Sequence, residues 1–416
     1  MKALVFSRQP ARYAAAMVAG TLRPGRGARY GPLSLRDVDE LELPAGDWLR
    51  LRPRLSGICG SDLATIDGRS SRYFEPIVSF PFTPGHEVVG DLEDGRRVVV
   101  VPVLTCSTRG VEPPCASCSA GAINLCERVA FGHLEPGLQC GFCETTGGGW
   151  SQEMVVHPSQ LVDVPEDLSD EQAVMIEPTA CAVHAARQVD AGRVAIIGAG
   201  TLGLLTVAAL RRLSPATEIL ATAKHPEQRR WAKELGADVV CAPGELARAV
   251  RSATGSMMVG DQLTGGVPAA VDCVGSEATL SQALAVVAPG GTVHVVGMPA
   301  RTTLDLTGLW HRETVLRGCY AYRREDFATA VELVADLALD RLVSALYPLA
   351  GVRVVAHEAV GQRRPGTLPV ACLQPLPQRP YGLGRGHDAL FRSRRSKATF
   401  TAPRDPAAAA WAMASS

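Results

Sequence analysis

The stretch RVAIIGAGTLGLLTVAALRRL, residues 193–213, decides the fold. Its first residues form a short apolar run that predicts a buried β-strand, and the residues after Gly200 predict a helix. Gly198, Gly200 and Gly203 have the spacing G-x-G-x-x-G. The first permits a tight turn, the second lets the backbone approach a pyrophosphate, and the third lets helix and strand pack closely. Glycines of an ordinary tight turn would look the same, but the flanking strand and helix favour a dinucleotide-binding turn.

The alternation of strand and helix continues after this turn. Apolar runs predict more strands, and helical periodicity predicts the helix between them. Strands that alternate with helices argue for a parallel sheet covered on both faces, so the fold class is α/β with a doubly wound, Rossmann-type sheet. The segments concerned are EILATA (218–223), PEQRRWAKELGA (226–237), VVCA (239–242), AAVDCVG (269–275) and GTVHVVGM (291–298).

The expected ligand of the turn is a nicotinamide dinucleotide. The helix start at Thr201 and Leu202 offers free N–H groups and a positive dipole to the phosphates, and Val274 is a further expected contact. An acidic residue about 20 positions after the turn would hold the ribose 2′-hydroxyl of NAD. That position is near Ala223, and Lys224 follows in place of an acid. A cation without an acid favours the 2′-phosphate of NADP over NAD, although an ordinary surface lysine would look the same.

The chain from residue 1 to about 165 has a different, β-rich pattern. Near residue 170 the segment SDEQAVMIEPTACAVHAARQV (169–189) predicts one helix, with Ser169 or Asp170 as its cap. A helix and short strands after residue 322 are expected to return to the first domain. The strongest strand candidates in the first part are WLRLRPRL (48–55), GHEVVGD (85–91) and RRVVVVPV (96–103).

These patterns predict two domains and a tail. A β-rich catalytic domain over 1–178, completed by 323–373, surrounds a nucleotide-binding domain over 179–322. The last segment, 374–416, holds seven basic residues against two acidic ones, several prolines and an alanine run. It has no period that would bury a face, so we expect disorder. It is either a basic interaction arm or an extension without a role.

Composition excludes several classes of partner. The 416 residues include 42 Lys and Arg against 42 Asp and Glu, so no global charge recruits nucleic acid or a membrane surface. The N-terminal apolar run is too short for a secretory signal, and no run approaches the roughly 18 apolar residues of a membrane span. We therefore expect a cytoplasmic protein that acts on a small molecule. In the cytosol, its twelve cysteines are expected to be metal ligands or buried thiols rather than disulfides.

Three distant segments carry the residue types of a catalytic zinc site. Cys59 lies in GICGSD, His86 and Glu87 lie in PGHE, and Glu177 lies in MIEP. Thiolate, imidazole and carboxylate are the usual zinc ligands, and a catalytic site uses three of them and an open position. Each residue alone could be a buried thiol, a loop histidine or a helix-capping carboxylate. Their occurrence together with a dinucleotide fold favours the metal.

The sequence resembles the zinc-containing medium-chain dehydrogenase/reductase family. The segments GICGSD, PGHE, EPTACAVHA, GAGTLG, VDCVG and PGGTVHVVG occur in the family's order between about residues 1 and 373. The resemblance implies a GroES-like barrel around a Rossmann domain, transfer of a hydride between NAD(P) and an alcohol or carbonyl, and a homodimer or homotetramer. A glutamate as third ligand is similar to the polyol and sugar dehydrogenase branch.

The resemblance also implies roles for individual residues. Cys59, His86 and Glu177 would hold the reactive zinc, with Glu87 beside it and able to exchange with Glu177 or water. Ser61 would pass on the hydroxyl proton, and Asp62 would hold the far nitrogen of His86. Many relatives carry a histidine five residues after the first zinc cysteine. Here that residue is Ala64, so the onward proton path stays open.

A second set of cysteines predicts a structural zinc site. Cys106, Cys115, Cys118 and Cys126 form C-x8-C-x2-C-x7-C, and the last three match the spacing of the family's structural zinc lobe. The first gap is six residues longer than in that lobe. Cys106 is the favoured fourth ligand, with Cys140 or Cys143, from CGFC, as the alternative.

The substrate cleft is less clearly marked. Trp150, after three glycines, is either a wall of the cleft or a core residue, and Tyr73 and Phe74 are candidates for the pocket. Two other functions stay open at this point. One is a zinc-free NADPH-dependent reductase of the same fold, and the other is a non-catalytic nucleotide-binding scaffold.

Overall fold

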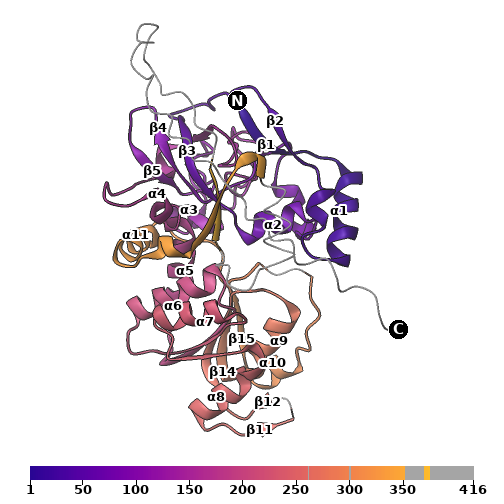
Figure 1. The fold of residues 1–416 in the computed structure, drawn as a ribbon, viewed down its shortest axis with the longest axis vertical. Coiled ribbons are helices and arrows are strands. Elements are labelled where there is room, and N and C mark those ends of the chain that lie inside the picture. Colours follow the sequence, from indigo (N-terminus) through magenta and orange to yellow (C-terminus); the bar gives the residue numbers. More distant parts are fainter. Residues whose placement is uncertain (261, 299–300, 352–369, 375–416) are drawn as a thin grey trace, which may run out of the picture. The chain divides into compact units, whose positions relative to one another are not determined.

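The computed structural model describes residues 1–260, 262–298, 301–351 and 370–374 (Figure 1). Residues 193–213 form a strand, β8 (Arg193–Ile197), followed by a helix, α6 (Thr201–Leu213), as predicted. β8 lies inside a six-stranded sheet of order β10-β9-β8-β13-β14-β15, and every pairing in it is parallel. Its other strands are β9 (Glu218–Thr222), β10 (Val239–Cys241), β13 (Val267–Asp272), β14 (Val287–Val295) and β15 (Val315–Gly318).

Helices connect these strands, as a parallel sheet requires. Alanine and leucine side chains of α6 pack in one core with the strand residues, and most of this helix is buried. The predicted Rossmann-type fold is confirmed. The connecting helices are α7 (Pro226–Glu234), α8 (Leu246–Thr254), α9 (Glu277–Val286) and α10 (Thr307–His311), and a small hairpin is formed by β11 (Met258–Val259) and β12 (Gln262–Leu263).

The β-rich part forms a second sheet, of order β16-β17-β3-β4-β5-β7, with β6 also paired to β3. Its late strands, β16 and β17, pair next to β3, so the C-terminal part of the chain does return to the first part. Proline at position 53 is accommodated because the β3–β4 register shifts between Pro53 and Leu55. The bounds are β3 (Leu49–Gly57), β4 (Val88–Leu92), β5 (Arg97–Val100), β6 (Met154–Val156), β7 (Leu161–Asp163), β16 (Val343–Pro348) and β17 (Val370–Gln374).

The helix predicted over 169–189 is two helices, α4 (Asp170–Ala173) and α5 (Ile176–Arg187). Ser169 is the cap, since its hydroxyl accepts from the backbone N–H of Gln172 at 3.1 Å. Proline at position 178 explains the break: it has no N–H to continue the ladder and is tolerated only in the first turn of a helix. The new helix start places Glu177 in the first turn of α5.

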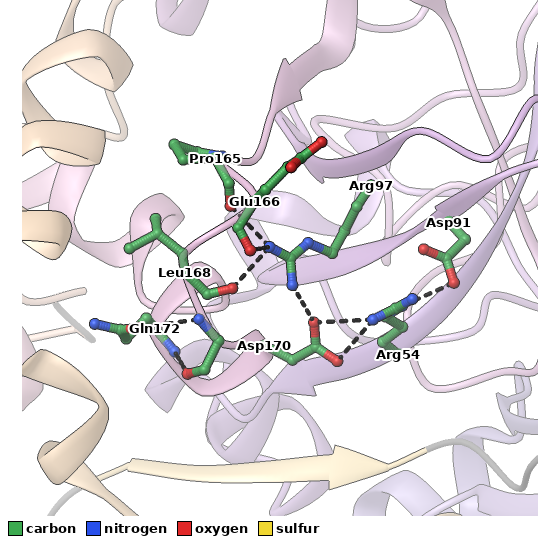
Figure 2. A network of polar contacts seen from close by, with 9 residues as sticks. Arg54, Asp91, Arg97, Pro165, Glu166, Leu168, Asp170 and Gln172 are labelled. Atoms are coloured by element: carbon green, nitrogen blue, oxygen red, sulfur yellow. Dashed lines mark hydrogen bonds and ion pairs between the residues drawn. The ribbon is translucent and has the colours of Figure 1, made fainter.

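A cluster of polar contacts fixes the start of α4 to the sheet (Figure 2). Arg97 of β5 donates to the carbonyls of Pro165 and Leu168 at 2.8 and 2.7 Å, and to the Asp170 carboxylate at 3.2 Å. Arg54 of β3 lies 3.4 Å from the same carboxylate. Because α5 follows α4 directly, this cluster also helps to orient the helix that carries Glu177.

A helix that the sequence analysis did not predict follows the first strand. β1 (Lys2–Phe6) pairs with β2 (Leu33–Asp37), and between them the chain forms α1 (Pro10–Leu22). Proline at the first helical position and a run of alanines were the available signals. The short helix α2 (Gly60–Ile66) was also not predicted, whereas α11 (Asp326–Asp336) lies in the helix expected after residue 322.

No helix of the described residues is long and apolar enough to cross a bilayer. Two predicted segments lie outside the described residues. They are most of the tail over 374–416, and residues 352–369 of the part expected to complete the first domain.

Candidate active site

Three of the predicted ligands meet at one point. The sulfur of Cys59, a ring nitrogen of His86 and a carboxylate oxygen of Glu87 all lie within 4.8 Å of one another. His86 and Glu87 are 5% and 8% exposed, so their charges have little contact with solvent. Glu177 is also buried but is not a member of this close group. The structure therefore places Glu87 in the position next to Cys59 and His86 where the resemblance implied Glu177.

Helix α2 positions the cysteine and its neighbours. Cys59 has an extended backbone and precedes the first turn, and its N–H donates to the Asp62 carboxylate at 3.1 Å. The other oxygen of this fully buried carboxylate lies 3.5 Å from Nδ1 of His86. Asp62 thus lies between the turn that carries Cys59 and the imidazole of His86. Ser61 lines the cavity beside them.

Close packing of β3 fixes Glu87. A Cβ on Gly57 would lie 1.8 Å from a carboxylate oxygen of Glu87, so only glycine leaves room for this side chain. The Gly57 N–H also donates to the Glu87 carbonyl at 2.8 Å. Trp150 is fully buried, and its indole N–H donates to the Gly57 carbonyl at 3.3 Å. Trp150 is therefore a core residue and not a wall of the cleft.

The electrostatics of this cluster suit a cation. Burial, and then the Glu87 carboxylate, raises the pKa of the Cys59 thiol. Burial, and then Glu177, raises the pKa of Glu87 to about 8. Burial disfavours the protonated form of His86, but the Asp62 carboxylate and Cys59 together outweigh it and hold the pKa well above its ordinary value. Several groups here would be anionic in water, and a divalent ion would relieve their mutual repulsion.

The second predicted metal set also comes together. The sulfurs of Cys106, Cys115, Cys118 and Cys126 lie within 4.8 Å of one another. Backbone N–H groups point at them, including that of Cys115, which donates to the Cys106 sulfur at 3.3 Å. The structure thus brings in Cys106 as the fourth member. This arrangement is typical of a zinc site with four thiolate ligands.

The alternative cysteines are part of the core. Cys140 and Cys143 are fully buried, and both belong to a hydrophobic cluster with Leu104 and Leu134. The Cys140 sulfur accepts from the side chain of Gln160 at 3.4 Å. All twelve cysteines of the chain are free thiols, in agreement with the expectation from composition.

The glycine turn has the geometry that a pyrophosphate requires. Gly198 has φ of 94°, and its N–H donates to the Thr222 hydroxyl at 2.9 Å. A Cβ on Gly203 would lie 1.8 Å from the Gly198 carbonyl, so helix and strand pack as closely as the motif predicts. Thr201, Leu202 and Val274 line the cavity that the turn faces.

Two basic side chains lie near Ala223, where the adenosine ribose of a bound dinucleotide is expected. Lys224 is exposed just after β9. Arg229, in the first half of α7, donates to the Ala223 carbonyl at 3.0 Å, so its guanidinium is held next to this position. The sequence analysis did not single out Arg229. A cation about one helical turn after Lys224 was the available signal.

A cavity of about 990 Å³ extends from the group of Cys59, His86 and Glu87 to the glycine turn. Cys59, His86, Glu87 and Glu177 line it together with residues of the turn. Phe74 lines it as predicted, whereas Tyr73 is 76% exposed and is not among the lining residues.

Comparisons with known proteins agree with this geometry. Residues 45–166 match the model of the alcohol dehydrogenase GroES-like domain, and residues 201–336 match that of the zinc-binding dehydrogenase. Sorbitol dehydrogenase of Bacillus subtilis (strain 168) is 30% identical over 80% of this chain and 90% of its own length. L-idonate 5-dehydrogenase of Vitis vinifera is 31% identical over 66% and 74%.

The chain belongs to the zinc-binding dehydrogenase family. A crystal structure of a zinc-binding dehydrogenase from Sinorhizobium meliloti 1021 bound to NADP superposes with a TM-score of 0.65, at 25% identity over 82% of this chain and 96% of that one. The protein is thus a zinc-dependent oxidoreductase that transfers a hydride between NAD(P) and an alcohol or carbonyl, in the medium-chain branch that includes the polyol dehydrogenases.

The dehydrogenase contains a buried arginine that sequence reasoning missed. Arg109 lies in the long first gap of the cysteine lobe and is fully buried. It donates to the carbonyls of Leu134 and Glu135 at 3.2 and 3.3 Å and to that of Gly137 at 2.6 Å. The six extra residues therefore bring in a side chain that satisfies the carbonyls of the next loop. No sequence signal distinguishes such an arginine from a surface one.

Proposed function

We propose that Cys59 and His86, with Glu87 and Glu177, hold the catalytic zinc, and that Cys106, Cys115, Cys118 and Cys126 hold a structural zinc. The observation that carries the proposal is the shared cavity. The cluster of thiol, imidazole and carboxylate opens on the same space as the dinucleotide turn. An alcohol in that space would therefore meet both the metal and the nicotinamide.

The chain's own residues then perform the remaining tasks. Bound zinc would supply Lewis acidity, which stabilises an alkoxide. Asp62 keeps His86 oriented through its ring nitrogen, and Ser61 accepts the proton of the substrate hydroxyl. Ala64 offers no donor or acceptor for the onward path. The hydroxyls of Thr65 and Ser70 lie 2.8 Å apart and line the same cavity, but Thr65 donates to the Ser61 carbonyl at 2.9 Å and has no link to the Ser61 hydroxyl. The onward proton path would therefore run through water or the cofactor ribose.

The exchange Cys59→Ser tests the metal assignment. We expect kcat to fall at least about 1000-fold, because the open zinc position would be lost, while NADPH binding measured by fluorescence changes little. Cys241→Ser, on the distant strand β10, is the control and should keep full activity. Unchanged turnover in Cys59→Ser would refute the catalytic zinc and would favour a zinc-free reductase of the same fold.

We infer that NADP is preferred to NAD. Lys224 and the anchored guanidinium of Arg229 provide two positive charges where the adenosine ribose would end, and Ala223 provides no carboxylate for a 2′-hydroxyl. Lys224→Ala should weaken NADPH binding about tenfold and NADH binding hardly at all, since a hydrogen bond to a charged group contributes ~1.5–3 kcal/mol and this lysine is exposed. Isothermal titration with both cofactors measures the effect.

The control for the cofactor is Arg230→Ala. This arginine lies beside Arg229 on α7 but pairs with Glu227, so both affinities should stay unchanged. Equal losses for NADPH and NADH in Lys224→Ala would contradict the preference.

The substrate is proposed to be a secondary or polyol-like alcohol, because the matched relatives include a sorbitol dehydrogenase and an L-idonate 5-dehydrogenase. We also propose a cytoplasmic homodimer or homotetramer. A panel of alcohols and polyols assayed with both cofactors tests the substrate class.

A further inference from the structure

A row of neighbouring aromatic rings begins beside His86 and follows one wall of the cavity. The Phe142 ring lies 5.8 Å from the His86 ring, and the Phe82 ring lies 5.3 Å from Phe142. Phe6 stacks on Phe82 at 5.1 Å, and the edge of Tyr13 meets Phe6 at 6.3 Å. All of these rings line the cavity, together with Phe74 and Phe80, but Phe6 and Phe82 are 4% and 3% exposed, so they mainly support the more accessible rings.

The far end of this wall is contributed by helix α1. Tyr13 is on α1 and Phe6 is on β1, so both precede residue 45, where the match to the GroES-like model begins. The wall therefore combines residues within the matched region, such as Phe82 and Phe142, with residues outside it.

Helix α1 is held firmly in place. The buried carboxylate of Asp67, just after α2, accepts from the backbone N–H groups of Gly25 and Gly27 at 2.9 and 2.7 Å. A Cβ on Gly20 or Gly27 would lie 2.5 Å from the Asp67 carbonyl, so the two segments are in backbone contact. A wall fixed in this way is formed before the substrate arrives, which saves the cost of ordering it on binding.

Several polar side chains on this side of the cavity have partners within the chain. Thr65 bonds to Ser70 and to the carbonyl of Ser61, at 2.8 and 2.9 Å. Arg69 donates to Asp67 at 2.7 Å, and Arg72 pairs with Glu75 at 3.4 Å. A polyol lying along the aromatic row itself would bury hydroxyls against ring faces without compensation, which is costly.

The geometry points to a substrate alcohol that carries a large apolar, preferably aromatic, substituent lying along the row from Phe142 to Tyr13. This inference rests on the proposed function and narrows it, since it selects hydrophobic secondary alcohols over polyols. Aromatic rings that meet edge to face or offset add to the burial of apolar surface. Ser7, Gln9 and Gln139 also line the cavity and suit at most a few further polar groups of such a substrate.

The zinc-loaded enzyme with NADP⁺ is assayed on three probes: 2-propanol, 4-phenyl-2-butanol and xylitol. We expect kcat/KM for 4-phenyl-2-butanol to exceed that for xylitol on the order of 100-fold, because the site would leave the hydroxyls of xylitol unpaired. A higher kcat/KM for xylitol overturns the inference while the proposed dehydrogenase function stands. Turnover of no alcohol at all would instead refute the proposed function.

The variant Tyr13→Ala separates the role of the wall from a general loss of structure. It should lower kcat/KM for 4-phenyl-2-butanol more than that for 2-propanol, because a methyl group is too short to contact Tyr13 at the far end of the row. Tyr13→Phe should retain activity on both, and Tyr30→Ala, an exposed tyrosine of the same segment, is the matched control. Equal losses on both alcohols in Tyr13→Ala would show a structural effect and overturn the inference.

Discussion

At the scale of single residues, the position of Glu87 next to Cys59 and His86 depends on a glycine in β3. Gly57 is not one of the proposed zinc ligands, yet its missing side chain leaves the space that the Glu87 carboxylate occupies. The Gly57 carbonyl, at the end of β3, also accepts a hydrogen bond from the indole N–H of Trp150. The ligand geometry is therefore fixed by the packing of the strand beneath it.

Gly57→Ala should displace the Glu87 carboxylate and lower kcat/KM on the order of 100-fold, because a shift of about 1 Å in a catalytic group is enough for such a loss. The zinc content, measured by mass spectrometry of the metal, should fall only at the catalytic site. Gly244→Ala is the control, since a Cβ there meets nothing within 4 Å. Full activity in Gly57→Ala would mean that Glu87 is not needed near the metal.

At the scale of elements, the cysteine lobe is a loop that is held together by few apolar contacts of its own. Its helices are short, α3 (Ala116–Ser119) and the single 3-10 turn Ile123–Leu125, and neither has a buried residue. Four sulfurs at one point replace the core that such a segment lacks. Burial opposes ionisation of Cys115, but N–H groups of Glu127 and Cys118 lower its pKa to about 7.

Cys106→Ser should weaken zinc binding in the lobe by more than about 100-fold and lower the melting temperature, because a structural site of this kind needs all four thiolates. The zinc content per chain should fall by half. Cys143→Ala tests the alternative ligand and should keep the full zinc content, even if the buried cavity lowers stability. The reverse pattern would reassign the fourth ligand.

At the scale of the whole molecule, several exposed apolar side chains lie on the nucleotide-binding part. Trp310 on α10 is 78% exposed, and Met257 and Val259 at the small hairpin are 69% and 66% exposed. Val315 and Leu316 are exposed on β15, which is the edge of the parallel sheet (Figure 1). Apolar patches and open strand edges of this kind favour association with a second copy.

If the proposed dimer forms through this edge, Leu316→Lys should shift it toward monomer. In a two-fold interface the substitution is present in both subunits. Losing the burial of two leucine side chains, about 1.5–3 kcal/mol each, should therefore raise the dissociation constant of the dimer more than about 100-fold. Light scattering after gel filtration measures the mass, and Leu43→Lys, an exposed loop leucine, is the control. A monomeric unmodified protein would contradict the proposed oligomer. The domain boundaries at 178 and 322 stay a prediction.

The sequence by itself determined the Rossmann-type sheet, the glycine turn and the identity of the metal-binding residue types, because periodicity and spacing are local properties of the chain. The helix α1 itself and the break at Pro178 had local signals that were not recognised. The sequence did not determine the placement of α1, the burial of Arg109, or the order of approach of Glu87 and Glu177 to Cys59. Those depend on which segments pack together: Asp67 on the glycines after α1, Gly57 on Glu87, and Arg109 on a neighbouring loop. Only the tertiary structure could decide them, since each contact joins residues that are separated by more than about 20 positions and that carry no shared local pattern.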